Sequence, residues 1–304
     1  MIMMEKVKKI WMDGELVDWD NAKVHILTHT LHYGCGVFEG IRCYNTIKGP
    51  AVFRLKDHVD RLFNSAKLLK IKIACTKEQL ISAVKETIKI NKLNACYIRP
   101  IIYYGYGVMG LDPKDAPVNT AVAVWPWGAY LGEEGLKKGI NVNISPYKRY
   151  PGELNKAKIC GNYYNSILAK INALENGYDE AVMFDTNNIL AEGSGENIFI
   201  IKDDVVKTPR LGSILPGITR DTVIKIAKNI GYKAAEADIY LEEFKDCDEA
   251  FFTGTAAELT PIRQIDEKVI GKGKRGPITE KLQSKFFDIV NGKDDYYLDW
   301  LDFV

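Results

Sequence analysis

Residues 157–165, AKICGNYYN, place a lysine where its amine could act as a nucleophile. Lys158 stands among small and apolar residues, and Gly161 and two tyrosines follow it. A lysine with the reference pKa of about 10.4 is protonated at neutral pH, so nucleophilic chemistry requires burial or nearby positive charge. Most lysines are solvated cations, and Lys156 lies only two residues away. Spacing alone therefore leaves open which lysine reacts, or whether either does.

Two turns could hold an anionic group through backbone N–H groups. LPGITRD, residues 215–221, ends a loop with Pro-Gly and begins a predicted helix at Thr219, so the N–H groups of Ile218 and Thr219 lie at a helix start. TGTAAELTP, residues 253–261, follows an apolar strand with a turn of small residues. Each motif alone is more often only structural.

Three charged side chains lie where a partner is expected. Arg61 is one position from the apolar face of its predicted helix, and Arg99 stands in an apolar strand. Glu192 ends the strand that opens AEGSGEN, residues 191–197. Ion pairing or exposure explains each side chain separately. Two arginines together with two anion-binding turns suggest a ligand with more than one acidic group.

A nominal GxGxxG occurs at residues 105–110, after a predicted strand. A dinucleotide site requires a helix directly after the glycines, whereas Pro113 and Pro117 interrupt any helix here. We predict a flexible glycine loop, with a mobile substrate flap as the alternative.

His25, His29 and His32 have i, i+4, i+7 spacing, which could gather a metal on one helix face. Thr28 and Thr30 are β-branched, and no carboxylate lies at ligand spacing. We therefore predict no metal site.

The bulk composition excludes several classes of protein. The chain has 304 residues, 46% hydrophobic and 27% charged, which is long enough for two domains. Its 41 basic and 40 acidic residues nearly cancel, so no overall field attracts nucleic acid or an anionic membrane. Six cysteines without CxxC spacing suggest free thiols. With no signal peptide at the N-terminus and no long apolar run, we expect a cytoplasmic globular protein.

Periodicity predicts the elements that position these residues. In the first part of the chain we expect a hairpin about Asp13-Gly14, helices over 57–69 and 77–91, and β-rich runs over 96–107 and 119–127.

In the later part of the chain, the same periodicity predicts alternating strands and helices. We expect a strand over 140–145, a helix with Ile167, Ile171 and Leu174 on one face and Gly177 at its end, strand pairs over 180–193 and 196–209, and a helix from Thr219 to Ile230. The alternation indicates an α+β protein with mixed sheets.

A glycine-rich, charged interruption over residues 125–137 predicts an interdomain linker. It would separate a smaller N-terminal domain, residues 1–124, from a larger domain, residues 138–304.

The motifs together closely resemble the branched-chain amino-acid aminotransferases, which are pyridoxal-phosphate enzymes of fold type IV. The resemblance runs nearly end to end and is carried, in chain order, by LHYGCGVFEGIRCY (31–44), KDHVDRLFNSAK (56–67), CYIRP (96–100), PWGAYLG (126–132), AKICGNYYNS (157–166), AEGSGENIF (191–199), LPGITRD (215–221) and TGTAAELTP (253–261). It implies a two-domain α+β fold with a smaller N-terminal α/β domain and a larger C-terminal domain built on a β-barrel-like mixed sheet.

The resemblance also implies a cofactor, pyridoxal 5′-phosphate, and residues that bind it. Lys158 would form the Schiff base and then carry the proton between the substrate Cα and the cofactor C4′. Glu192 would pair with the pyridine nitrogen. The remaining cofactor contacts would come from Tyr163 at the phenolic oxygen and from Arg61, Ile218, Thr219 and Thr255 at the phosphate.

Substrate contacts follow from the same resemblance. The α-carboxylate would bind the backbone of Thr255 and Ala256 and the Tyr97 hydroxyl. Phe38, Tyr130 and Tyr163 would surround an apolar substrate side chain. The second carboxylate of glutamate would bind Arg99, together with Tyr33 of the partner subunit.

The implied reaction is reversible transamination of L-leucine, L-isoleucine and L-valine with 2-oxoglutarate, which gives branched-chain 2-oxo acids and L-glutamate through a ping-pong cycle. A homodimer would be the minimal active unit, with a higher homo-oligomer also open. The alternatives are a D-amino-acid aminotransferase or aminodeoxychorismate lyase of the same fold type, and a noncatalytic protein that binds a phosphorylated metabolite.

Overall fold

The computed structural model describes residues 4–128 and 130–304. Residues 1–3, part of the N-terminus predicted to carry no signal peptide, and residue 129, inside the predicted linker, lie outside the described residues. The chain forms two compact units. The first comprises Met1–Trp127, Ala157–Asn162 and Ile289–Val304, and the second comprises Gly128–Lys156 and Tyr163–Asp288.

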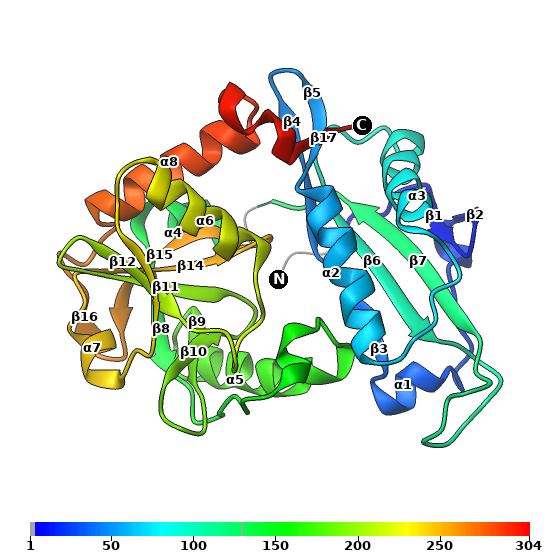
Figure 1. The fold of residues 1–304 in the computed structure, drawn as a ribbon, viewed down its shortest axis with the longest axis horizontal. Helices are drawn as coiled ribbons and strands as arrows, with labels where there is room; N and C mark the ends of the chain where they lie inside the picture. The colour runs from blue at the N-terminus through cyan, green and yellow to red at the C-terminus, as the bar shows by residue number, and fades with distance from the viewer. Residues whose placement is uncertain (1–3, 129) are drawn as a thin grey trace. The chain divides into compact units, whose positions relative to one another are not determined.

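The first unit is built on an antiparallel sheet. Its strands are β1 (Lys9–Met12), β2 (Glu15–Asp18), β3 (Gly36–Phe38), β4 (Ile41–Thr46), β5 (Gly49–Phe53), β6 (Cys96–Tyr104), β7 (Val118–Trp125) and β17 (Leu301–Phe303). The strand order is β17-β5-β4-β6-β7-β1-β2, and β3 pairs with β6 (Figure 1). The C-terminal strand β17 therefore joins β5, far from it in sequence.

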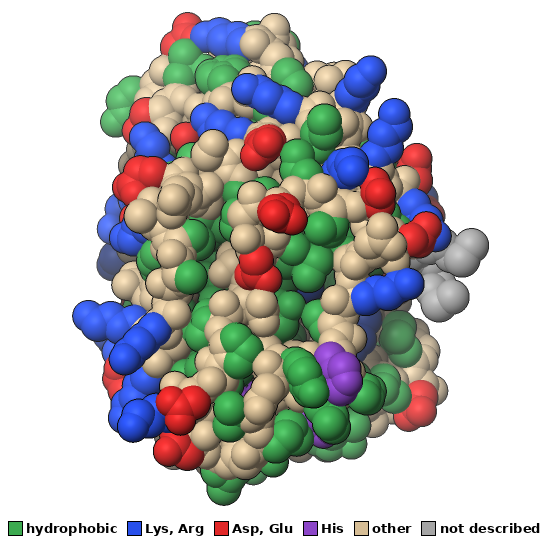
Figure 2. Space-filling view, turned by 90° about the vertical axis from the view of Figure 1, so that its right-hand side faces the viewer, with side chains coloured by type: hydrophobic (Ala, Val, Ile, Leu, Met, Phe, Trp, Pro, Cys, Tyr) green, Lys and Arg blue, Asp and Glu red, His purple; other side chains and the backbone are tan. Residues whose placement is uncertain are grey.

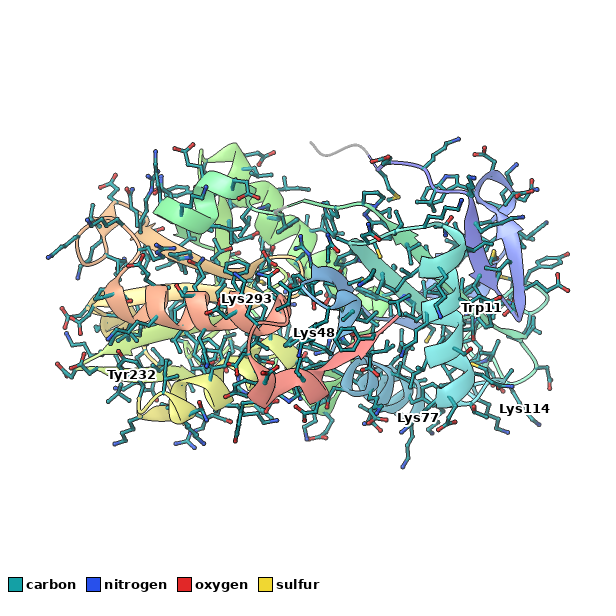
Figure 3. All side chains as sticks on the ribbon, turned by 90° about the horizontal axis from the view of Figure 1, so that it is seen from above. Trp11, Lys48, Lys77, Lys114, Tyr232 and Lys293 are labelled. Atoms are coloured by element: carbon teal, nitrogen blue, oxygen red, sulfur yellow. The ribbon has the colours of Figure 1, made fainter. Side chains whose placement is uncertain are left out.

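The predicted opening hairpin is confirmed. Met12 pairs with Glu15 in the register of β1 and β2. Asp13 and Gly14 between them have φ angles of 49° and 103°, and positive values at both central positions are typical of the type I′ hairpin turn. Trp11 on β1 is buried and lies close to α3 (Lys77–Ile90) (Figure 3).

Helices cover this sheet as the periodicity predicts. They are α1 (His29–Tyr33), α2 (Leu55–Leu68) and α3. The unit also has short 3₁₀ helices, formed by residues Trp19–Asn21, Cys160–Asn162 and Asp295–Trp300. Thr76 and Gln79 form a reciprocal capping box that fixes the start of α3. Leu62 of α2 and Val84 of α3 are fully buried in the core of this unit.

The second unit contains a closed barrel. Its strands are β8 (Ile140–Ile144), β9 (Glu180–Phe184), β10 (Leu190–Gly193), β11 (Asn197–Lys202), β12 (Val205–Pro209), β13 (Ala234–Ala237), β14 (Glu249–Gly254), β15 (Glu258–Ile265) and β16 (Lys268–Val269). The order β10-β9-β8-β15-β14-β11 closes because β10 also pairs with β11. β8 runs parallel to β9 and β15, and the other pairs in this ring are antiparallel. The predicted α+β fold with a barrel-like mixed sheet is confirmed.

Helices surround the barrel. They are α4 (Gly132–Lys138), α5 (Tyr163–Glu175), α6 (Ile218–Asn229), α7 (Leu241–Lys245) and α8 (Pro277–Val290), with a 3₁₀ helix at Glu153–Lys156. Phe244 and Phe252 are fully buried in the core of this unit. α4 occupies much of the stretch predicted as a linker. The predicted domain boundaries, residues 1–124 and 138–304, remain a prediction. Residues 157–162 and 289–304 fall within the predicted larger domain but pack with the first unit.

α5 buries an unexpected face. Its small residues Ser166, Ala169 and Ala173 are buried. The larger apolar residues, at spacings that place them on the other face, are exposed: Tyr164, Ile167, Leu168, Ile171 and Leu174. This apolar face of α5 requires a different explanation from packing in the core of its own chain.

A second group of exposed apolar residues belongs to the first unit, around α1 and the loop after β6. It comprises Val24, Ile26, Leu27, Leu31, Tyr33, Tyr106, Met109 and Leu111. Figure 2 shows hydrophobic and histidine side chains gathered toward the lower edge of one face of the molecule. Among residues 4–128 and 130–304, no helix has the length and hydropathy to cross a lipid bilayer.

Candidate active site

Lys158 is held by its backbone on both sides. Its N–H donates to Ser65 Oγ of α2 at 3.0 Å, and its carbonyl oxygen accepts from the Phe38 N–H of β3 at 3.1 Å. The neighbouring Ile159 forms an antiparallel bridge with Val37. Lys158 Nζ lies 5.0 Å from the centroid of the Phe38 ring, so this ring covers one side of the amine. The lysine segment thus has a fixed position on α2 and β3.

Lys156 has different surroundings. Its Nζ contacts both carboxylate oxygens of Glu153 at 2.9 Å, and 47% of its side chain is exposed. This is a surface ion pair of the kind that contributes little to stability.

Arg61 lies in a buried charge network that the sequence did not predict. Its Nε and Nη2 donate to Oε1 and Oε2 of Glu39 at 2.7 and 2.8 Å, a bidentate pair. His58 Nδ1 lies 2.7 Å from Glu39 Oε2. Glu39 and His58 are both buried. We name these three residues, Glu39, His58 and Arg61, the Glu39 network.

The protonation states of the Glu39 network follow from its contacts. Burial alone would raise the pKa of Glu39, but Arg61 and the hydrogen bonds from His58 and Arg61 hold it well below its usual range. Burial lowers the pKa of His58 in spite of the Glu39 carboxylate. The carboxylate is therefore charged and the imidazole neutral at neutral pH. Because a carboxylate can only accept, His58 Nδ1 carries the hydrogen.

Arg99 lies on aromatic rings. Its guanidinium Cζ is 4.7 Å from the Phe38 ring centroid and 5.3 Å from that of Tyr97. Nη2 donates to the Tyr97 hydroxyl at 3.2 Å. Arg99 Nε is buried and has no hydrogen-bond partner among the described residues, which is costly unless a ligand supplies the acceptor. The structure thus brings together Phe38, Tyr97 and Arg99, which the sequence analysis had assigned to the substrate.

Tyr33 ends α1, and 42% of it is exposed. Its ring centroid lies 4.6 Å from that of His29. His29 Nε2 is 2.8 Å from the Gly110 carbonyl oxygen, so α1 supports the loop predicted as a glycine loop. An exposed tyrosine at this position is accessible to another molecule.

Glu192 lies at the end of β10, buried among donors in the second unit. Its Oε1 is 3.2 Å from Arg149 Nε, an ion pair outside hydrogen-bond geometry. Its Oε2 accepts from Asn197 Nδ2 at 3.3 Å and from the Leu215 N–H at 3.2 Å. Arg149 is a functional candidate that the sequence analysis missed, because it lies more than forty positions away in the chain, with no local motif.

Asn197 connects the second unit's predicted site residues. It pairs with Glu192 across β10 and β11 and with Thr253 across β11 and β14. Its Nδ2 also donates to the Leu215 carbonyl oxygen at 2.9 Å, in the turn before α6. A Cβ on Gly217 would lie 1.9 Å from Asn197 Oδ1, so a larger residue there would displace the Asn197 amide. Asn197 therefore gathers Glu192 and both anion-binding turns at one end of the barrel.

Both predicted anion-binding turns have suitable backbone. Gly217 is the N-cap of α6, so the N–H groups of Ile218 and Thr219 lie in the first turn of a 12-residue helix. Thr255 and Ala256 lie in the turn between β14 and β15, where Gly254 pairs with Glu258. The buried Thr253 Oγ1 just before that turn has no hydrogen-bond partner within the described part of the chain.

The remaining two predicted residues also belong to the second unit. Tyr163 is the first residue of α5. The ring of Tyr130 lies 5.7 Å from Lys170 Nζ, and Lys170 pairs with the buried Glu180 at 2.7 Å. Both tyrosines are partly buried.

Glu196 adds a further buried carboxyl group to AEGSGEN. Its Oε2 accepts from the Gly195 N–H at 3.0 Å. Burial, followed by the charge of Glu180, raises the pKa of Glu196 to about 8. A neutral Glu196 leaves the charge of Glu192 with less repulsion.

Each unit thus holds one group of the predicted residues. The first unit has Tyr33, Phe38, Arg61, Tyr97, Arg99 and Lys158, and the second has Tyr130, Tyr163, Glu192, Ile218, Thr219, Thr255 and Ala256. The first group offers an amine and two guanidinium groups. The second offers a carboxylate and two turns of backbone donors, a set suited to a ring nitrogen and to anionic groups.

Comparison with known proteins agrees with this chemistry. The family model for amino-transferase class IV matches residues 36–265. A branched-chain-amino-acid aminotransferase of Pseudomonas aeruginosa is 48% identical over 306 residues, which cover 100% of both chains. One of Escherichia coli K12 is 42% identical over 304 residues, with 99% of this chain and 98% of that protein covered.

Solved structures give the same result. The E. coli branched-chain amino acid aminotransferase superposes with a TM-score of 0.96 at 42% identity, over 98% of this chain and 99% of that chain. The T.th. branched-chain amino acid aminotransferase crystallised with pyridoxamine 5′-phosphate has a TM-score of 0.95 at 45% identity, with the same coverage. The chain therefore belongs to the branched-chain-amino-acid aminotransferases of the class IV aminotransferase family.

Proposed function

We propose that this protein transfers amino groups reversibly between L-leucine, L-isoleucine or L-valine and 2-oxoglutarate, and that it uses pyridoxal 5′-phosphate. The products are branched-chain 2-oxo acids and L-glutamate. The observation that carries the proposal is 48% identity, across the full length of both chains, to a branched-chain-amino-acid aminotransferase. Crystals of similar enzymes contain pyridoxamine 5′-phosphate or N-(5′-phosphopyridoxyl)-L-glutamate.

The residues present fit this cofactor. The first turn of α6 and the β14–β15 turn offer backbone N–H groups for a phosphate. Glu192 offers a carboxylate that already accepts from Asn197 and Leu215. When bound, the cofactor supplies an electron sink for the negative charge left at the substrate Cα.

Each predicted residue then has a role. Lys158 would hold the cofactor covalently through Nζ, and its amine, when free, would carry the proton removed from the substrate Cα. The Glu192 carboxylate, held by Asn197 and the Leu215 N–H with Arg149 beside it, would keep the pyridine nitrogen protonated. The proposed contacts to the phenolic oxygen and the phosphate come from Tyr163, and from Arg61, Ile218, Thr219 and Thr255.

Recognition of two unlike substrates follows from Arg99. Its guanidinium lies against the rings of Phe38 and Tyr97, which hold it in place. An apolar substrate side chain can then pack on the aromatic surface of the pocket without displacing the guanidinium. Its buried Nε can donate to a carboxylate oxygen of glutamate. We further propose that Tyr130 and Tyr163 line the apolar part of the pocket, and that the α-carboxylate binds the Tyr97 hydroxyl and the backbone of Thr255 and Ala256.

A homodimer is the proposed minimal active unit, with a higher homo-oligomer as the other option, and Tyr33 of the partner subunit would contact the glutamate carboxylate. Two exposed apolar surfaces support association of copies: the apolar face of α5, and the group around α1. All six cysteines are free thiols, which supports a cytoplasmic location.

Turnover of L-leucine against D-leucine tests the function. With 2-oxoglutarate as acceptor, the holoenzyme should form L-glutamate from L-leucine and none from D-leucine. Turnover of D-leucine alone would instead indicate the D-amino-acid aminotransferase alternative. Absence of bound cofactor after addition of pyridoxal phosphate would indicate a noncatalytic binding protein.

A further inference from the structure

We propose that Glu39 and His58 are positioning residues that orient Arg61 toward the cofactor phosphate. The inference rests on the proposed role of Arg61, and it adds two residues to which neither the sequence analysis nor the resemblance assigns a task.

The geometry fixes the guanidinium plane. Glu39 is fully buried, and both of its oxygens bind Arg61 along one edge of the guanidinium. The backbone N–H of Glu39 donates to the Pro100 carbonyl oxygen at 2.9 Å, so the acceptor itself is anchored. An unrestrained arginine has many rotamers, whereas a bidentate pair leaves one orientation. Arg61 would therefore bind an anion without first losing that freedom.

His58 completes the arrangement from one helical turn away. It lies three residues before Arg61 on α2, and its Nδ1 reaches Glu39 Oε2 at 2.7 Å. Because the imidazole is neutral, it restrains the carboxylate without competing with Arg61 for its charge. The third donor fills the Oε2 lone pair that Arg61 Nη2 leaves available, so the carboxylate cannot rotate away.

The polar face of α2 also points to this role. His58, Arg61 and Ser65 have i, i+3, i+7 spacing, and Ser65 contacts the backbone of Lys158. The charge of Lys158 contributes to lowering the pKa of His58, so the network lies within electrostatic range of the proposed nucleophile. A buried ion pair is a poor device for stability alone, since apolar residues of similar volume are often as stable.

The test compares cofactor binding with and without its phosphate. Apoenzyme is titrated with pyridoxal 5′-phosphate and with pyridoxal, and the two dissociation constants are measured by absorbance. We expect Glu39→Gln to weaken binding of pyridoxal phosphate by about tenfold or more and to leave binding of pyridoxal within about twofold. Arg61→Met should show the same selectivity, and the double variant should be no weaker than Arg61→Met alone.

A milder pair of variants covers the case in which Glu39→Gln does not fold. His58→Leu removes the third donor and should weaken pyridoxal phosphate binding a few fold, whereas His58→Asn keeps an N–H near Nδ1 and should restore it. The matched control is Glu249→Gln, because Glu249 is a buried carboxylate that binds backbone N–H groups of Ile278 and Thr279. For Glu249→Gln, the ratio of the dissociation constants for pyridoxal phosphate and pyridoxal should equal that of the wild type.

The outcomes separate the two proposals. If Arg61→Met is selective for pyridoxal phosphate but Glu39→Gln and His58→Leu weaken both ligands equally, the positioning role is wrong and the role of Arg61 stands. Independent, multiplying effects of Glu39→Gln and Arg61→Met would overturn it in the same way. If Arg61→Met itself shows no selectivity, the proposed phosphate contact is wrong and the positioning role is wrong with it.

Discussion

Ser65 Oγ on α2 accepts a hydrogen bond from the backbone N–H of Lys158 at 3.0 Å. Ser65 is fully buried, and the carbonyl of Lys158 accepts from Phe38 at 3.1 Å. The lysine segment therefore packs with the first unit, although the chain before and after it belongs to the second. Its position depends on contacts far away in sequence.

Ser65→Ala should slow transamination without removing it. The variant loses one hydrogen bond, about 1 kcal/mol, so we expect kcat to fall about fivefold while the protein remains folded. Thr87→Ala is the matched control, because the buried Thr87 hydroxyl donates within its own helix, to Ala83 at 2.6 Å. Equal kcat values for the two variants would show that the hydrogen bond between Ser65 and the Lys158 backbone has no catalytic effect.

Arg99→Met should separate the two substrate classes. Loss of hydrogen bonds between charged groups, about 1.5–3 kcal/mol, should raise KM for 2-oxoglutarate by roughly 10- to 100-fold, with KM for L-leucine changed little. Arg42→Met serves as the control. Arg42 lies on β4, where it donates to the Trp127 carbonyl at 3.2 Å, and its loss should alter neither KM. A parallel rise for both substrates in Arg99→Met would count against the assignment of Arg99.

Glu196→Gln should change how stability depends on pH. The pKa of Glu196 is raised to about 8, chiefly by burial and then by Glu180, with Gly195 and Lys170 opposing and Glu192 adding to the rise. The folded state therefore binds a proton that the unfolded state has lost, from the ordinary value of 4.5 up to about 8. Stability from this group is present below that window and is lost as the pH rises through it.

The measurement is the melting temperature of both proteins from pH 5 to 9. Glutamine is neutral throughout, so the advantage of Glu196→Gln over the wild type should grow with pH. Glu133→Gln replaces an exposed carboxylate on α4 and should give a small difference that does not grow. An advantage of Glu196→Gln that stays constant or shrinks with pH would contradict the buried, protonated carboxyl.

Ile171→Glu should disrupt association of subunits. A charge in the centre of the apolar face of α5 would be buried without a partner in any interface formed there. Sedimentation should show a lower mass than the wild type, with reduced turnover. Lys228→Glu, an exposed charge change on α6, should keep the wild-type mass. An unchanged mass for Ile171→Glu would mean that this face is not an interface.

Local signals predicted most of the elements. Asp13-Gly14 has the sequence of a tight hairpin turn, and Thr76 with Gln79 forms the cap that starts α3. Local signals could not predict barrel closure through β10 and β11, since it depends on pairing across the whole sheet, and only the family resemblance implied a barrel-like sheet. Periodicity identified the face of α5 with Ile171 but did not show that it is exposed, because core and interface surfaces have the same composition.

The site was predicted from motifs, and its supporting residues were not. Glu39 and His58 lie inside quoted motifs, but their pairing with Arg61 joins two segments that sequence spacing does not relate. Asn197 contacts Glu192 across the β10–β11 pair, and Arg149 contacts it from the segment after β8. Two signals were available in the sequence. One is the charged Glu39 next to glycine in FEG, and the other is His58, three residues before Arg61 on one helix face.

Covalent trapping is the decisive test of Lys158 as the nucleophile. Holoenzyme reduced with borohydride and digested should yield one peptide that carries the cofactor, with the label on Lys158, and Lys158→Ala should yield none. Label on Lys156, on any other residue, or on no residue of the wild type would contradict this assignment and the mechanism built on it.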